Sequence, residues 1–66
     1  MRLTVNGRDF SHEDGMSVAA LVDRVANRRR GVAVAVNGTV VPRSTWESAR
    51  LADGDAVEVL TAAQGG

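Results

Sequence analysis

Two glycines, Gly65 and Gly66, close the sequence, and their chemistry is that of an unhindered acyl group. Glycine has no Cβ, so these residues can adopt nearly any backbone conformation and fit a narrow passage. Only hydrogens flank the Gly66 carbonyl, which lets a nucleophile approach it. Because a free carboxylate is a poor acyl donor, we expect a partner enzyme to adenylate it, using ATP and Mg²⁺. Attack of sulfur on that adenylate would give a thiocarboxylate.

A terminus that reacts in this way must be delivered to another protein by a folded body. We expect residues 1–61 to form one domain and residues 62–66 to form a flexible tail, with Gln64 giving the glycines access to the partner. Five extended residues span up to about 17 Å at about 3.4 Å per residue. Leu60 is an apolar residue on the same strand face as Glu58, just before the tail, and is the candidate partner contact.

The rest of the composition excludes several other kinds of chemistry. The chain has no Cys and one His, so it offers no disulfide, no thiolate nucleophile and no zinc site. Its basic and acidic residues balance, which argues against nucleic acid or an anionic membrane as partner. No stretch is long and apolar enough to span a bilayer or to serve as a signal peptide. We therefore expect a cytoplasmic protein that binds no cofactor or metal itself and is no enzyme.

Five strands are predicted, over residues 2–6, 8–12, 32–36, 39–41 and 56–61. Residues 2–6 alternate between polar and apolar side chains, and residues 32–36 alternate between large and small apolar ones. Asn6-Gly7 joins the first strand to the second, and Asn37-Gly38 joins the third to the fourth. Asn-Gly is the strongest signal for a type I′ hairpin turn. A right-handed crossover would place the last strand beside the first.

One helix is predicted between the second and third strands. Ser17 suits an N-cap, and the apolar residues that follow share one helical face. These residues are Val18, Leu21, Val22 and Val25. Arg28–Arg30 are expected to close the last turn, and Gly31 to stop the helix. This arginine run is typical of a solvated helix end, with an anion or partner patch as the alternative.

The order of these elements predicts an α+β fold of the ubiquitin-like β-grasp type. In that fold a mixed sheet of four to five strands packs on one helix. Residues 44–50 are expected to form a weak helical turn around Trp46, with Leu51 in the core. Residues 53–55, Asp-Gly-Asp, are read as a turn rather than a metal site.

Four short motifs follow one another along the chain: Val36-Asn37-Gly38, Val41-Pro42-Arg43-Ser44 with Trp46, Asp53-Gly54-Asp55 with Val57-Glu58, and Gln64-Gly65-Gly66. Taken together and in this order, they resemble the ThiS family of sulfur carriers in thiamine thiazole synthesis. The resemblance implies a β-grasp fold and adenylation of Gly66 by a ThiF-like enzyme that uses ATP and Mg²⁺. It also implies a thiocarboxylate at Gly66, which delivers sulfur to a ThiG-like thiazole synthase.

Three other functions are compatible with the same features. A related β-grasp carrier could serve molybdopterin or cysteine synthesis, although the Val41–Ser44 stretch favours the thiamine pathway. A ubiquitin-like protein modifier would use the same terminal glycines. A noncovalent interaction module would not use them at all.

Overall fold

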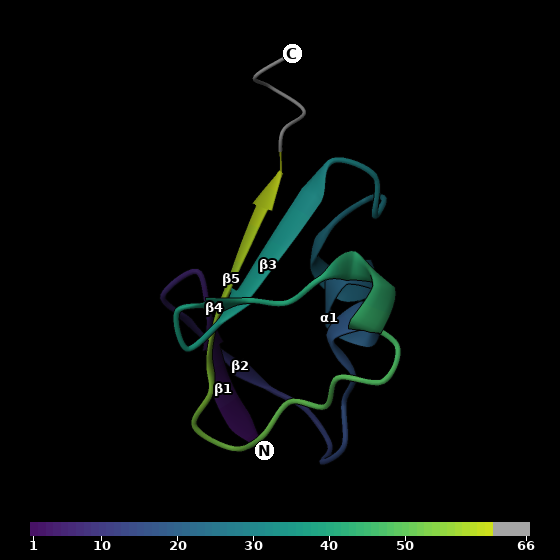
Figure 1. Cartoon of the computed structure of the whole chain (residues 1–66). Helices are drawn as coiled ribbons and strands as arrows, with labels where there is room; N and C mark the ends of the chain where they lie inside the picture. Colours follow the sequence, from purple (N-terminus) through teal and green to yellow (C-terminus); the bar gives the residue numbers. More distant parts are fainter. Residues whose placement is uncertain (62–66) are drawn as a thin grey trace.

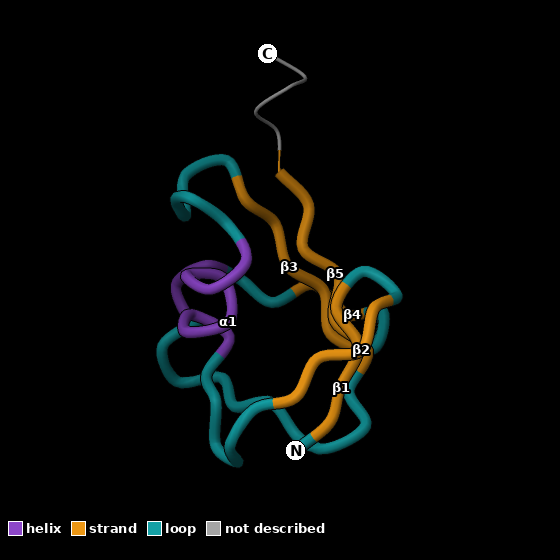
Figure 2. Tube along the Cα trace, turned by 180° about the vertical axis from the view of Figure 1, so that it is seen from behind, coloured by secondary structure: helices purple, strands orange, loops and turns teal. Residues whose placement is uncertain are grey.

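Over residues 1–61, which are the residues that the computed structural model describes, five strands form one mixed sheet and one α-helix covers a face of it (Figures 1 and 2). The elements in chain order are β1 (Arg2–Val5), β2 (Arg8–Ser11), α1 (Val18–Val25), β3 (Val32–Val36), β4 (Thr39–Val40), the 3₁₀ turn η1 (Arg43–Thr45) and β5 (Ala56–Thr61). The predicted α+β fold, with a four- to five-stranded sheet on one helix, is confirmed.

The last strand lies at the centre of the sheet. The strand order is β2-β1-β5-β3-β4, with β5 parallel to β1 and antiparallel to β3. This confirms that the last strand pairs beside the first, as the handedness of crossovers requires. The consequence for function is that β5, the strand that leads to the carboxyl end of the sequence, is held from both sides.

Both hairpin turns have the predicted geometry. Asn6 and Gly7 have φ values of 53° and 83°, and Asn37 and Gly38 have φ values of 52° and 85°. Positive φ at both central residues defines the type I′ turn, whose twist matches that of the flanking strands. The register of β1 with β2 and of β3 with β4 therefore follows from local sequence.

The core lies between the helix and the inner face of the sheet. Its buried apolar residues are Leu3, Val5, Met16, Val18, Ala19, Leu21, Val22, Val34, Trp46, Leu51, Val57 and Val59. Trp46 is 1% exposed, and its indole Nε1 donates a hydrogen bond of 3.0 Å to the Val41 carbonyl. Leu51 is also buried, which confirms its predicted place in the core.

The helix begins where the sequence predicts but ends earlier. The Ser17 hydroxyl accepts a hydrogen bond from the Ala20 backbone N–H, as an N-cap does. The prediction that Arg28–Arg30 close the last turn is wrong, because the helix ends at Val25 and Ala26 is already extended. Val25, expected in the core, is 42% exposed. The chain must leave the helix here to enter β3, and the arginines have no apolar side chains that would favour another buried turn.

Candidate functional site

The candidate site is the place where β5 brings the chain out of the sheet. Thr61 is the last residue of β5 and of the described part of the chain. Figure 1 shows β5 running past the body of the molecule to one of its ends. The predictions for Gln64, Gly65 and Gly66 concern positions outside the described residues. The geometry that bears on them is therefore how firmly β5 is held and what surrounds its end.

On one side, β3 supports β5 along its length. The antiparallel pairing runs from Val36 opposite Val57 to Val32 opposite Thr61. The other neighbour, β1, pairs with β5 only as far as Val57, opposite Val5. Beyond Val57, β5 therefore has a neighbouring strand on the β3 side only.

The side chain of Asn6 fills this gap. Its Oδ1 accepts a hydrogen bond of 2.8 Å from the Val59 N–H, and its Nδ2 donates one of 3.1 Å to the Val59 carbonyl. The Asn6 backbone N–H also donates to the Val57 carbonyl. An amide side chain can offer a donor and an acceptor at once, so Asn6 acts as an additional strand residue beside β5.

Asn37, in the other hairpin turn, holds the opposite end of the same strand. Its Oδ1 accepts from the Ala56 N–H at 2.9 Å, and its Nδ2 donates to an Asp55 carboxylate oxygen at 3.0 Å. Sequence reasoning gave both asparagines a turn role only. The signal that could have revealed more is their residue type, since glycine or aspartate would also suit the turn but could not both donate and accept.

Leu60 lies where the sequence predicts, on the outer face of the sheet, and is 63% exposed. The pairing register places it beside Ala33, and places Ala35 between Val40 and Glu58. Paired residues point to the same face of a sheet, so these side chains share the face opposite the helix. We call Ala33, Ala35, Val40 and Leu60 the outer apolar strip. Val40 is 70% exposed and was not anticipated from the sequence.

Other groups that could do chemistry have structural contacts instead. The His12 ring stacks on Phe10, with centroids 6.4 Å apart, and its Nδ1 lies 3.2 Å from the Glu13 carbonyl oxygen. Asp53 accepts from the Arg2 backbone N–H at 2.7 Å, which supports its reading as a turn residue. Within residues 1–61, no three His, Asp or Glu side chains gather in a way that could hold a metal ion. No helix in this same part of the chain is long and apolar enough to cross a membrane.

The fold is shared with solved structures. The crystal structure of the thiamine biosynthesis protein ThiS from Geobacter metallireducens superposes with a TM-score of 0.82 and 35% identity, covering 92% of this chain and 93% of that one. A solution structure of a thiamine biosynthesis protein from the same organism gives a TM-score of 0.73 and 33% identity, covering 91% and 81%.

Relatives known from sequence agree with these structures. The sulfur carrier protein ThiS of Escherichia coli is 29% identical over 66 residues, which is the whole of both chains. A thiazole synthase of Paramagnetospirillum magneticum is 33% identical over 66 residues, and this chain spans 20% of the length of that protein. The model of the ThiS family matches residues 2–66, so that the match covers almost the entire sequence. The chain therefore belongs to the ThiS family.

Proposed function

We propose that this chain is a sulfur carrier protein of thiamine biosynthesis that carries its sulfur as a thiocarboxylate on Gly66. One observation carries the proposal: the family match extends through residue 66, so that it includes the residues that would react. The whole-length similarity to a sulfur carrier protein supports the same conclusion. The fold can present Gly66 to a partner, because β5, which leads toward it, is hydrogen-bonded on both sides up to Val59.

The proposed chemistry has two steps. A ThiF-like partner transfers AMP from ATP to the Gly66 carboxylate and releases pyrophosphate, with Mg²⁺ neutralising the phosphate charges. A sulfide-level sulfur atom then attacks the activated carbonyl and expels AMP, which leaves the thiocarboxylate. Both steps need an unhindered carbonyl, and two successive glycines supply one.

In this proposal the chain is a co-substrate rather than an enzyme. ATP and Mg²⁺ belong to the adenylating partner, and the carrier itself binds no cofactor. Residues 62–66, when extended, would reach about 17 Å from the domain at about 3.4 Å per residue. That length brings Gly66 into the active site of a partner docked against the end of β5. Adenylation and sulfur transfer take place in the cytoplasm, where the adenylating enzyme and the sulfur acceptor are expected.

The proposed acceptor of the sulfur is a ThiG-like thiazole synthase. In the relative from Paramagnetospirillum magneticum, a stretch similar to this whole chain occupies about a fifth of a protein named thiazole synthase. A carrier-like segment joined to a synthase is held at a high effective concentration beside it, which favours transfer between the two. This arrangement supports the thiamine pathway over molybdopterin or cysteine synthesis for the present chain.

The outer apolar strip is the proposed docking surface for these partners. Leu60 and Val40 are large apolar side chains with most of their surface in water, and their neighbours Ala33 and Ala35 are small. A partner can therefore approach the sheet closely and bury Leu60 in a pocket. Because Leu60 precedes Thr61 in β5, docking there also fixes the starting point of the last five residues.

Transfer of labelled sulfur tests the proposed pathway. The chain is adenylated by its ThiF-like partner in the presence of ³⁵S-labelled sulfide, which displaces AMP, and is then re-purified. It is mixed with the thiazole synthase of the same organism or with molybdopterin synthase, each supplied with its other substrates. We expect label to appear in the thiazole product only. Label in molybdopterin alone would contradict the thiamine assignment, and attachment of the chain to other proteins through Gly66 would favour a ubiquitin-like modifier.

A further inference from the structure

The loop that follows the helix lies at the same end of the molecule as the end of β5. We call residues 27–31 the arginine loop. It leads into Val32, which pairs with Thr61 in the antiparallel register. The arginine loop therefore lies at the same end of the sheet as Thr61. Figure 1 shows the loop and the end of β5 at one end of the molecule. Three consecutive arginines are thus placed near the point where the last five residues begin.

The middle arginine, Arg29, has a structural role. Its Nε and Nη2 donate to the two carboxylate oxygens of Asp23 at 2.9 Å and 2.8 Å, and its Nη1 donates to Glu47 at 2.8 Å. These hydrogen bonds hold the pKa of Asp23 below its usual value. One cation is thus matched by two carboxylates, which join the loop to α1 and to the segment after η1. Arg29 therefore links the arginine loop to two other segments of the domain.

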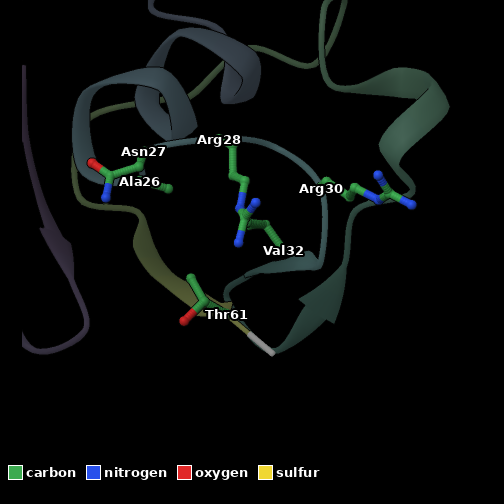
Figure 3. A pocket seen from close by; sticks show the side chains of 6 residues that line it. All are labelled: Ala26, Asn27, Arg28, Arg30, Val32 and Thr61. Atoms are coloured by element: carbon green, nitrogen blue, oxygen red, sulfur yellow. The ribbon is translucent and has the colours of Figure 1, made fainter. Parts of the chain in front are cut away.

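Arg28 and Arg30, on either side of that anchor, remain available. Both are exposed, and the hydrogen bonds and ion pairs within residues 1–61 involve other side chains. Figure 3 shows the Arg28 side chain directed toward Val32, while that of Arg30 extends away to the other side. They border an open hollow of about 160 Å³. Its lining residues are Ala26, Asn27, Arg28, Arg30, Val32 and Thr61.

We infer that Arg28 and Arg30 bind carboxylates of the adenylating partner at the mouth of the active site that receives Gly66. The inference rests on the proposed function and adds the chemistry of the partner's surface. A span of at most about 17 Å is short for a buried reaction centre, so the rim of that centre must close around the end of β5. Residues beside Thr61 then face the rim, and guanidinium groups pair with carboxylates through two parallel hydrogen bonds.

The local charge supports a protein partner with acidic groups. The chain as a whole has no net charge, and Arg28 and Arg30 line the same hollow as Thr61, which places two positive charges at this end of the molecule. A nucleic acid would need a wider basic face than these two residues provide. Complementary charges at an interface accelerate encounter and fix the orientation of docking. For a carrier, that orientation directs the last residues at the entrance of the partner's active site.

A double charge reversal tests this inference. The variant Arg28→Glu/Arg30→Glu is compared with Arg8→Glu/Arg43→Glu, which makes the same charge change at the start of β2 and at the start of η1. Pyrophosphate release by the ThiF-like enzyme of the same organism is measured over a range of salt concentrations. We expect the first variant to raise KM about tenfold at low salt, with little change in kcat and a weaker salt dependence of KM. The control should stay within about twofold of wild type.

The outcomes separate this inference from the proposed function. If the wild-type chain is not adenylated, the proposed function is wrong and the inference falls with it. If the wild-type chain reacts but the Arg28→Glu/Arg30→Glu variant has the same KM, only the inference is overturned. Equal losses in both double variants would also overturn it, since they would show a general charge effect. Urea unfolding of each variant, expected to match wild type, shows that the fold is retained.

Discussion

The side-chain amide of Asn6 hydrogen-bonds both the N–H and the carbonyl of Val59, a residue 53 positions later in the chain. Asn6 also has a φ of 53°, so the same residue makes the first turn and completes the support of the last strand. Gly7, the other central residue of the turn, has no side chain, so the Asn6 amide is the side-chain group of this turn that reaches β5. The side chain of Asn6 therefore couples the first hairpin to β5, the strand that leads toward Gly66.

Replacing Asn6 tests this coupling. Asn6→Gly keeps the turn but leaves the polar groups of Val59 without their partner, so we expect urea denaturation to show a loss of about 1–2 kcal/mol. Asn6→Ala should cost about 1–2 kcal/mol more, because alanine is strained at positive φ. An Asn6→Gly chain as stable as wild type would show that the two hydrogen bonds contribute nothing.

A pair of alanine substitutions in α1 tests where its buried face ends. Leu21 is fully buried, so Leu21→Ala should lower the free energy of unfolding by about 2–5 kcal/mol. Val25 is 42% exposed, and Val25→Ala should cost less than about 1 kcal/mol. Thermal or urea unfolding measures both. A larger cost at Val25 than at Leu21 would contradict the placement of Val25 outside the core.

The pH dependence of stability should reveal the anchor of the arginine loop. Hydrogen bonds from Arg29 hold the pKa of Asp23 below its usual value of 3.8. A lowered pKa in the folded state stabilises the fold above the unfolded pKa, and this contribution is lost as pH falls through the folded value. Asp23→Asn should therefore be less stable than wild type at neutral pH, and the difference should shrink in acid. Urea midpoints that differ equally at neutral and acidic pH would argue against the pair.

Leu60 is expected to matter for docking and not for folding. Because its side chain is 63% exposed, Leu60→Glu should change stability by about 0.5 kcal/mol or less. The KM for adenylation should rise about tenfold, as for the loss of an apolar anchor. Val25→Glu, at an exposed apolar residue on the helix, is the matched control and should leave KM near wild type. Equal kinetics for both variants would remove Leu60 from the interface.

Local signals were sufficient to predict most of the fold. Alternation located the strands, the two Asn-Gly pairs fixed the hairpins, and Ser17 marked the start of the helix. The end of the helix was not predictable in this way. Arg29 binds Asp23 and Glu47, the second of which is 18 residues away, and helix propensity carries no information about such a contact.

The candidate site was predicted in part. Leu60 was recognised from its position on a polar strand face before the last five residues, and its exposure agrees. Asn6 was missed because its contact with Val59 joins strands distant in sequence. Val40 was missed because the exposed face of the β3–β4 hairpin is set by the pairing of β3 with the distant strand β5. For the same reason, the sequence left open which face of β3 is buried, whereas the pairing with β5 directs Val34 into the core.

The mass of the intact protein tests the central claim most directly. The chain is incubated with ATP, Mg²⁺, a sulfur donor and a ThiF-like enzyme of proven activity, and a chain lacking Gly66 is treated alongside. The account predicts a mass increase of one oxygen-to-sulfur exchange, located on Gly66 by fragmentation and absent from the shortened chain. An unchanged mass, or an exchange at any other residue, would contradict it.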